Sequence, residues 1–568
     1  MVEIHSTPRN EPVHADHLKH SHAHEEAIPG TVNLSAEDGD DTAYGQALFP
    51  VPALDPNDPL QWPTSKKTAI LVIVSVYSFL GNASLTGISV YINLFSELFG
   101  VSPTDASNLI NYPNLCFGFS SLVWVPLYLK IGRRPVMLGT LICFLVGLIA
   151  ASQAKTFGGL MAARCVHAFG AGVCEALPVQ LVNDIFFIHE RGKRIGYYTV
   201  CLCLASAAPL AAGYMLSGGH SWTLYFYVCL AFGLAVFVVT FLVVEETSYD
   251  RTAALAAESP SSLSSSPSRQ ASVNNNDASE KQPTSTTADL ALSTTNSAPS
   301  SGPLPPPRKT YLQTLSVTGR IDHNVSIVGT VLRAFSYFLV PQALWVITTY
   351  GANIGLGAFA VGFTFPILIT SPPYNWSVIN SGLQALAPTI AFLAAVPFTS
   401  LSDRLAAYLT RRNGGIREAE MRLGVLLVPM LIGPAGLLLY GIGADRQLPW
   451  PAFFLGSGLM SWSGYFYFAF TIAYAVDAHF ANTSEMLIAI NVGKQAVSFG
   501  FGNAVLQWVV SVPHGYAVVV GGIFVGVLAA NNLVVIVFLV WGKAIRRAMA
   551  RSWLARLHRS THVAGEVH

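Results

Sequence analysis

The sequence has 568 residues, of which 52% are hydrophobic and 11% charged, with a net charge of +1 and a mean hydropathy of +0.47. Soluble globular proteins carry about 25% charged residues. This composition therefore excludes a soluble globular protein and predicts a polytopic membrane protein. A net charge near zero gives no basis for a nucleic-acid partner. The sequence contains no zinc-type cysteine spacing, phosphate-binding loop or nucleophile elbow. We therefore expect neither an enzyme nor a cofactor or metal site.

The chain begins with a polar segment, residues 1–65, which we expect to be a disordered cytoplasmic tail. Its histidine cluster at residues 14–24 has no fixed framework that would hold a metal. Within residues 66–250 follow six apolar runs, each long enough to cross about 30 Å of hydrocarbon. They predict an N-terminal six-helix bundle. The runs cover residues 68–95, 106–129, 135–154, 157–182, 195–216 and 220–244.

A Ser/Thr/Pro-rich stretch, residues 251–325, interrupts the hydrophobicity and is predicted to be a disordered, dispensable cytoplasmic linker. A second six-helix bundle is expected over residues 326–542, followed by a basic amphipathic cytoplasmic tail, residues 543–568. The predicted fold class is an all-α polytopic membrane protein with twelve transmembrane helices in two six-helix bundles. The second set of runs covers residues 330–370, 379–401, 423–443, 450–478, 485–511 and 515–541.

Lysine and arginine in the short loops predict the orientation. They gather on the side that also carries the linker and both ends of the chain, and the positive-inside bias places that side in the cytoplasm. Asn375, between the seventh and eighth helices, is then the sequon available for N-glycosylation. In the basic tail, apolar residues recur at four-residue steps among arginines. This pattern is typical of a helix on an anionic membrane surface or, alternatively, of a calmodulin target.

Four ionisable residues lie inside predicted membrane helices, where a charge costs roughly 2.5 to 3.5 kcal/mol. Arg164, His167 and Glu175 share the fourth helix, and Lys494 lies in the eleventh. We predict that they form the path of substrate and proton. Glu175 lies about 16 Å along the helix from Arg164, so we expect it to be unpaired and to carry the coupled proton, with His167 next in line. The structural alternatives are packing pairs with neighbouring helices and snorkelling of Lys494 toward the interface.

Arginines and aspartates recur after the second and eighth helices and at the ends of the fourth and tenth. These residues are Arg133, Arg134, Asp184, Asp403, Arg404 and Asp477. An arginine that bridges to an aspartate on a neighbouring helix can hold a cytoplasmic gate closed until the lobes move. We expect Asp184 to pair with Arg133 or Arg134, and Asp477 with Arg404. The positive-inside bias alone explains the arginines but not the aspartates.

Three strings carry a resemblance to a known family. The loop at residues 125–134 reads Val-Pro-Leu-Tyr-Leu-Lys-Ile-Gly-Arg-Arg, residues 164–168 read Arg-Cys-Val-His-Ala, and residues 208–213 read Ala-Pro-Leu-Ala-Ala-Gly. They resemble the signatures Gly-x-x-x-Asp-Arg-x-Gly-Arg-Arg, Arg-x-x-Gln-Gly and Gly-Pro-x-x-Gly-Gly of the major facilitator superfamily, specifically its fungal drug:proton antiporter branch. The third string keeps Pro209 and Gly213 of the antiporter signature but replaces two glycines with alanine.

The resemblance implies a two-lobed transporter that binds its substrate between the halves. We therefore predict a monomeric, proton-coupled antiporter of the plasma membrane that exports a small organic compound such as a secondary metabolite, toxin or drug. Its partners would be this substrate, protons and the lipid bilayer. Proton-driven import of polyamines or organic cations, with Glu175 as counter-charge, is the alternative within the same class. A non-transporting membrane sensor is the alternative from another class.

Overall fold

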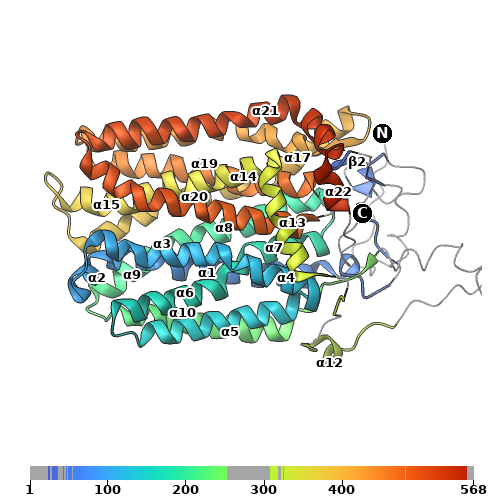
Figure 1. The fold of residues 1–568 in the computed structure, drawn as a ribbon, viewed down its shortest axis with the longest axis horizontal. Coiled ribbons are helices and arrows are strands. Elements are labelled where there is room, and N and C mark those ends of the chain that lie inside the picture. The colour runs from blue at the N-terminus through green and yellow to red at the C-terminus, as the bar shows by residue number, and fades with distance from the viewer. Residues whose placement is uncertain are drawn as a thin grey trace, which may run out of the picture.

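The computed structural model describes residues 24–25, 28–35, 42–43, 46–47, 49–53, 55–251, 307–317, 321–323, 325–479 and 482–559. Its long helices run side by side along one axis, and β2 and α22, near the two ends of the chain, lie at the same end of the bundle (Figure 1). We call this end the terminal end and the opposite end the distal end. Most of the predicted linker, including the part expected to be dispensable, lies outside the described residues.

The N-terminal half is a bundle of antiparallel helices that follow the predicted apolar runs. They are α1 (Thr64–Thr86), α2 (Ile92–Phe99), α3 (Pro103–Phe119), α4 (Ser121–Ile131), α5 (Arg133–Ser152), α6 (Phe157–Ala171), α7 (Ala176–Ile185), α8 (Ile188–Leu204), α9 (Ala208–Ser217) and α10 (Thr223–Val243). At the distal loops, side-chain caps begin α3 and α6, where Ser102 and Thr156 accept hydrogen bonds from the backbone of the first turn.

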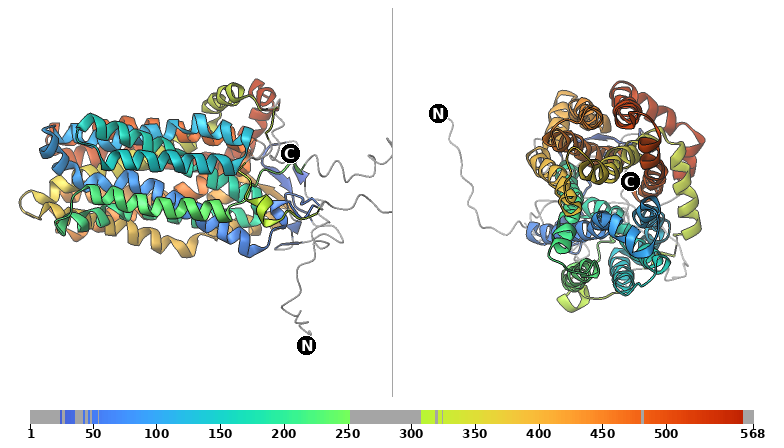
Figure 2. Two further views of the ribbon diagram at one scale, coloured as in Figure 1. Left: turned by 90° about the horizontal axis from the view of Figure 1, so that it is seen from below. Right: turned by 90° about the vertical axis from the view of Figure 1, so that its left-hand side faces the viewer.

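The C-terminal half repeats this arrangement after the linker. Its long helices are α14 (Pro341–Ala352), α15 (Ala360–Thr370), α16 (Leu386–Ala395), α17 (Leu401–Arg412), α18 (Pro429–Asp445), α19 (Pro451–Ala478), α20 (Thr483–Ser511) and α21 (Val525–Ala550). Short helices lie outside the bundles: α12 (Tyr311–Thr314), α13 (Ile327–Ser336) and α22 (Trp553–Arg559). Seen end-on, the two halves form two groups of helices, blue to green and orange to red (Figure 2, right).

Ten helical segments in the described part of the chain are long and apolar enough to cross a membrane. Two others, α19 and α20, have 28 and 29 residues and carry many hydroxyl and amide side chains. Together they match the twelve spans predicted from the sequence. Helices suit a bilayer because each backbone N–H and C=O is bonded within the segment. The predicted all-α fold of two six-helix bundles is confirmed.

Small residues allow the closest helix pairs. A Cβ added to Gly147 of α5 would overlap the backbone of His167 on α6, and one added to Gly436 of α18 would overlap the carbonyl of Gly456 on α19. In a bilayer, where apolar helices gain little from burial against each other, such close approach is a main source of helix association. These pairs hold each half together internally.

The N-terminal tail departs from the sequence prediction. Instead of being disordered to residue 65, it forms β2 (Thr31–Asn33), which pairs antiparallel with β1 (His24–Glu25) and with β5 (Ile416–Glu418) of the other half. A separate pair joins β3 (Thr42–Ala43) to β4 (Gln46–Ala47). The Thr31 hydroxyl also donates to Glu418 at 2.8 Å. The tail gains order because β5 offers an unpaired strand edge, which hydropathy does not reveal.

The basic tail also differs from expectation. Helix α21 continues to Ala550, past the predicted end of the bundle at residue 542. Arg546 is buried rather than turned toward a membrane, and its Nη2 donates to Glu418 and Glu420 at 2.6 Å each. Trp553 of α22 is 58% exposed. The two carboxylates explain the change, because a buried guanidinium needs charged acceptors.

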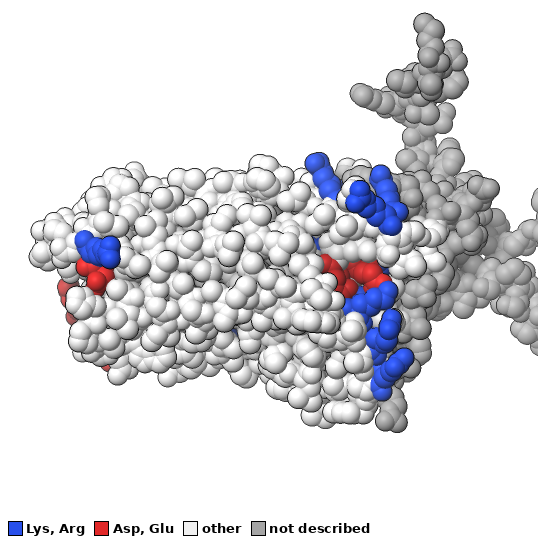
Figure 3. Space-filling view, turned by 90° about the horizontal axis from the view of Figure 1, so that it is seen from above, with Lys and Arg blue, Asp and Glu red and all other residues white. Residues whose placement is uncertain are grey.

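Charged side chains on the face shown in Figure 3 gather at the two ends and leave a wide uncharged belt between them. Large apolar side chains are exposed along the helices, for example Phe232 at 63%, Leu431 at 66% and Val540 at 64%. Such a surface would be unfavourable in water but matches hydrocarbon. The belt is the surface that we assign to lipid.

Candidate functional site

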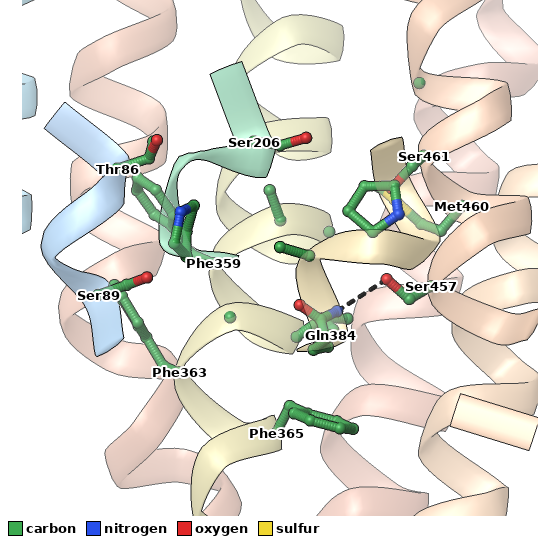
Figure 4. A pocket seen from close by; sticks show the side chains of 18 of the residues that line it. Thr86, Ser89, Ser206, Phe359, Phe363, Phe365, Gln384, Ser457, Met460 and Ser461 are labelled. Carbon is green, nitrogen blue, oxygen red and sulfur yellow. Dashed lines mark hydrogen bonds between the residues drawn. The ribbon is translucent and has the colours of Figure 1, made fainter. Parts of the chain in front are cut away.

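A cavity of about 190 Å³ lies between the two halves (Figure 4). The N-terminal half contributes Thr86, Ser89, Val90, Ile110, Ser206 and Pro209. The C-terminal half contributes most of the remaining wall, including five phenylalanines from α15, α16, α19 and the segment before α15. Membrane transporters of two repeated halves bind their substrates at such an interface.

Interruptions of regular α-helix surround the cavity. The wall includes residues of the 3-10 segments η3 (Gly87–Tyr91), η5 (Ala205–Ala207) and η9 (Val378–Ala385), and of the π-helical segment η8 (Asn353–Phe359). Non-helical backbone at membrane depth is tolerated where it lines a cavity, and π-helical turns are frequent at functional sites. The breaks therefore position this cavity as the candidate binding site.

The wall offers hydroxyl and amide groups. Gln384 donates to Ser457 at 2.9 Å (Figure 4), and Asn353 donates to the carbonyl of Thr349 at 2.8 Å. Ser206 Oγ has no hydrogen-bond partner among the described residues. No Asp, Glu, Lys, Arg or His is present among the described residues that line the cavity. Its chemistry is that of aromatic surface with a few neutral hydrogen-bonding groups.

On the distal side of the cavity, the antiporter-like string meets the other half. Pro209 and Gly213 lie on α9, and a Cβ added to Gly382 of η9 would lie 3.4 Å from the Pro209 carbonyl oxygen and 4.0 Å from the Gly213 Cα. Between α3 and α20, Tyr112 and Phe499 pack edge to face with ring centroids 5.4 Å apart. Close backbone approach therefore joins the halves distal to the cavity, and the aromatic contact joins them beside it, two residues beyond Ile110 of the cavity wall.

A buried ion pair lies next to the cavity and joins the halves. The ammonium of Lys494 on α20 pairs with the carboxylate of Glu175, and the two residues are 0% and 6% exposed. Lys494 Nζ also lies 4.5 Å from the centroid of the Tyr350 ring. Tyr350 packs against Phe468, with centroids 4.4 Å apart, and Phe468 lines the cavity. One aromatic ring therefore separates the ion pair from the cavity wall.

A break in the fourth helix positions Glu175. The 3-10 turn η4 (Gly172–Cys174) separates α6 from α7, and Glu175 follows it as the residue before α7. A Cβ at Gly172 would overlap Ser120, the residue at which α3 gives way to α4. Tyr198 donates to the backbone carbonyl of Glu175 at 3.2 Å. The close crossing of these two helices, permitted by glycine, turns the Glu175 side chain toward the other half.

The expectation that Glu175 is unpaired was wrong. Arg164 lies too far along the same helix to reach it, as predicted, but Lys494 reaches it from the opposite half. Lys494 does not snorkel to the interface, since it is fully buried and paired. The sequence analysis kept a pair with a neighbouring helix as the structural alternative but named no partner, and the partner comes from a helix more than three hundred residues later.

Two other predicted path residues are not among those that line the cavity. Arg164 donates to the carbonyls of Leu109 at 2.7 Å, Ser84 at 3.3 Å and Leu85 at 2.9 Å. These carbonyls lie on α1 and α3 of the same half, so Arg164 ties that half together near the point where α1 ends. His167 is fully buried against Phe144, with ring centroids 6.0 Å apart. The structure therefore assigns packing contacts, rather than path contacts, to both residues.

At the terminal end of the N-terminal half, one predicted gate pair is present. Arg133 Nε lies 3.0 Å from the carboxylate of Asp184, which also accepts a hydrogen bond from Thr247 at 3.0 Å. Arg134 instead donates to the carbonyl of Phe241 at 2.7 Å. Asp184 thus pairs with Arg133, one of the two partners predicted from the sequence.

At the terminal end of the C-terminal half, the predicted pair is absent. Asp477 is held by Arg422 and, at 3.5 Å, by Arg417, and Arg422 also contacts Asp403 at 2.6 Å. Arg404 is exposed and forms no ion pair within the described ranges. Asp403 and Arg404 are adjacent on α17, where successive side chains point about 100° apart, so only one of them can face the bundle.

Asp403 also joins the two halves. Its carboxylate accepts a hydrogen bond from the backbone N–H of Lys193 on α8 at 2.6 Å. Nearby, Tyr465 donates to the carbonyl of Gly196 at 3.3 Å, and Ser484 donates to Gln180 at 3.2 Å. We call these contacts, together with the Arg422 pairs, the terminal-end closure. They connect the halves on the side of the cavity opposite to the contacts of Pro209 and Gly213.

Sequence reasoning missed three residues of this arrangement. Arg422 was counted only among the basic loop residues that set the orientation, although it lies within the 3-10 segment η11 (Ala419–Leu427) and is fully buried. Tyr350 and Gln384 lie in apolar runs and were read as ordinary membrane residues. A signal for Gln384 existed, since an amide inside a membrane helix is unfavourable without a partner.

A family model described as Major Facilitator Superfamily matches residues 71–502. The chain belongs to the Major Facilitator Superfamily. It is therefore a multi-pass membrane protein and a secondary transporter. The contacts at both ends of the cavity are those between the two lobes of this superfamily's fold.

Curated relatives of the chain are fungal. An uncharacterized MFS-type transporter of Schizosaccharomyces pombe is 24% identical and spans 94% of this chain and 95% of its own. Protein HOL1 of Saccharomyces cerevisiae is 23% identical over 85% and 90% of the two chains. A probable efflux pump of Aspergillus flavus is 24% identical over 72% and 87%.

Solved structures agree on the fold. The proton:xylose symporter XylE bound to 6-bromo-6-deoxy-D-glucose is 12% identical, with a TM-score of 0.52, over 84% of this chain and 96% of that one. The human organic anion transporter MFSD10 is 14% identical, with a TM-score of 0.50, over 84% and 100%.

Proposed function

We propose that this secondary transporter is a proton-coupled exporter of a small amphipathic organic compound. The observation that carries the proposal is the Glu175–Lys494 ion pair, which joins the two halves beside the cavity. An ion pair buried at this depth costs desolvation energy that a packing role alone does not require, because apolar residues of the same volume often stabilise a protein better. A role in the transport cycle accounts for its presence.

In the proposed cycle, a proton from the acidic side binds Glu175 and removes its negative charge. Lys494 is then left as a lone ammonium, and breaking a buried pair in this way costs about 3–5 kcal/mol. Separation of the halves, which admits water to the ammonium, relieves this cost. Release of the proton on the other side restores the pair and closes the bundle again. The membrane potential adds about 2.3 kcal/mol per charge per 100 mV to this exchange.

Two observations support export. Pro209 and Gly213 of the antiporter-like string lie where the halves meet distal to the cavity. A relative from Aspergillus flavus is named a probable efflux pump. The alternative of cation import, in which Glu175 would be the counter-charge of the substrate, loses support because Lys494 already neutralises that carboxylate.

The coupling is tested by efflux of the dye Nile red from yeast cells that lack their own export pumps, in acidic and in neutral medium. The wild-type protein should export faster into acidic medium. Glu175→Gln should reach the membrane but lose this dependence on external pH. Glu97→Gln, a change of an exposed carboxylate on α2, is the matched control and should behave as wild type. Wild-type pH dependence in Glu175→Gln would contradict the proposal.

Substitution of Lys494 gives a second, independent test of the proton coupling. Lys494→Met leaves the Glu175 carboxylate buried without its partner, so transport should be lost. The double variant Glu175→Gln, Lys494→Met removes both charges and should fold and insert normally, but transport without response to pH. A double variant that keeps a wild-type pH response would show that another group carries the proton.

We also propose that the terminal end faces the cytoplasm and that the protein acts as a monomer in the plasma membrane. The basic side chains of the terminal end support this orientation. Asn375 lies exposed in the distal loop between α15 and η9, on the outer side in this orientation. Removal of N-glycans should therefore increase the gel mobility of the wild type but not of Asn375→Gln, and an unchanged wild-type mobility would contradict glycosylation at this site.

A further inference from the structure

The cavity and the charges of the molecule are kept apart. No ionisable side chain is among the described residues that line the cavity. Glu175 and Lys494 lie behind the Tyr350 ring and neutralise each other, and the guanidinium of Arg164 is bound to the carbonyls of Leu109, Ser84 and Leu85. Tyr350 itself is 3% exposed. A ligand in the cavity therefore meets aromatic and neutral polar groups.

The neutral polar groups lie on opposite walls. Gln384 and Ser457 lie on the C-terminal half, hydrogen-bonded to each other, and Ser206 projects from the N-terminal half (Figure 4). The hydroxyl of Ser206 has no partner within the described residues. Each of these groups can donate and accept a hydrogen bond. They can satisfy hydroxyl, carbonyl or amide groups on two sides of one ligand.

The aromatic groups cover the remaining surface. Phe359 and Phe363 stack with ring centroids 5.3 Å apart and an interplanar angle of 17°, and Phe365, Phe392 and Phe468 complete the set. Phenyl faces attract a cation only weakly, and burying an ammonium without a carboxylate partner carries a larger penalty. The wall therefore favours a flat apolar body over a charged group.

The space distal to the cavity has the same chemistry. A smaller cavity of about 30 Å³ shares Ser89, Phe363 and Ser381 with the main one and adds Asn93 and Ser107. None of its described lining residues is ionisable. The neutral lining thus extends from the binding site toward the distal end.

From this separation we infer that the transported compound is uncharged in its bound form: an aromatic or otherwise flat apolar body carrying hydroxyl, carbonyl or amide groups at two of its edges. This inference rests on the proposed function, since it names the substrate class of the same transporter. It assigns Gln384, Ser457 and Ser206 as the groups that bind the polar edges. Polyamines and quaternary or protonated amines are excluded by the same wall.

The test uses binding to the purified full-length protein, followed by thermal unfolding in detergent without any proton gradient. The three probes share one ring system: 2-(1-naphthyl)ethanol, 2-(1-naphthyl)ethylamine, and the N-acetyl derivative of that amine. At neutral pH the alcohol and the amide are uncharged and the amine is a cation. We expect the alcohol and the amide to raise the unfolding temperature at concentrations about tenfold lower than the amine requires.

Gln384→Glu places a carboxylate in the wall and should reverse this order, so that the amine binds better than the alcohol. Gln495→Glu, on α20 outside the cavity lining, is the matched control and should keep the wild-type order. Equal or stronger binding of the amine by the wild type, or failure of both neutral probes to bind, would overturn the inference. Neither outcome would contradict the proposed proton coupling, because the coupling is measured separately by the pH response of Glu175→Gln.

Discussion

The terminal ends of the two halves use the same residue types in different ways. In the N-terminal half, one aspartate pairs with one arginine, Asp184 with Arg133 at the start of α5. In the C-terminal half, one arginine serves two aspartates, because Arg422 contacts both Asp403 and Asp477. The first arrangement stays within its own half. The second also reaches the other half through the bond from the Lys193 backbone to Asp403.

The N-terminal tail increases this difference. Strand β2 pairs with β5 in the C-terminal half, while Asp58, further along the tail, forms an ion pair with Arg251 of the N-terminal half at 3.1 Å. The tail is therefore attached to both halves, and its attachment to the C-terminal half lies beside Arg417 and Arg422. The comparison indicates that closure at the terminal end depends more on the C-terminal network than on the N-terminal pair.

The largest effect is expected from Arg422→Met. It leaves Asp403 and Asp477 buried without their main partner, at a cost of about 3–5 kcal/mol, so the unfolding temperature in detergent should fall strongly. Arg404→Met is the matched control, next to Asp403 on α17 but outside the network, and should change stability little because Arg404 is exposed. Equal losses in both variants would mean that Arg422 is not the centre of the network.

A smaller effect is expected from Arg133→Met. Asp184 keeps its hydrogen bond from Thr247, so the loss should be about 1.5–3 kcal/mol, the range for a hydrogen bond to a charged group. Thermal unfolding of Lys130→Met, in the last turn of the preceding helix α4, supplies the baseline. A loss as large as that of Arg422→Met would remove the proposed difference between the halves.

Val32→Pro tests the attachment of the tail. Ala419 N–H bonds to Gly30 and Leu34 N–H to Gly415, and alternation along an antiparallel pair makes Val32 and Arg417 the hydrogen-bonded partners between them. Proline removes the backbone N–H donor of residue 32, which should lower the free energy of unfolding by about 1 kcal/mol. A cysteine introduced at Ala478, which lies against Gly30, should then react faster with a maleimide. The control Ser35→Ala should leave the rate of the maleimide reaction unchanged. An unchanged rate in Val32→Pro would contradict the idea that the tail covers this site.

The smallest effect concerns pH. Burial opposes the ionised form of Glu418, but hydrogen bonds from Lys543, Arg546 and Thr31 outweigh it, so the pKa of Glu418 lies below its ordinary value of 4.5. A lowered folded-state pKa contributes stability that is present above the ordinary value and is lost as the pH falls through the folded value. Unfolding temperatures should therefore drop less steeply below about pH 4.5 in Glu418→Gln than in the wild type. Parallel curves would contradict this contribution.

Much of the architecture follows from local sequence. Apolar runs of membrane length predict the helices because hydrocarbon leaves backbone groups no partner outside their own segment. The same physics makes the charges within those runs stand out, so that Glu175 and Lys494 are found without a structure. The pair of Asp184 with Arg133 is also predictable, because both lie at the same end of neighbouring helices.

Partners across the molecule are decided only by the tertiary structure. The sequence indicates Glu175 and Lys494 separately as candidate functional residues. Their pairing depends on how the two halves pack, and a hydropathy pattern carries no information about that packing. The rotation of α17 turns Asp403 inward and Arg404 outward. Asp477 therefore pairs with Arg422 instead of with Arg404, its predicted partner. Likewise, the polar tail is ordered because β5 supplies an edge for β2. Periodicity and charge thus determine which side chains must be satisfied, and long-range packing determines which groups satisfy them.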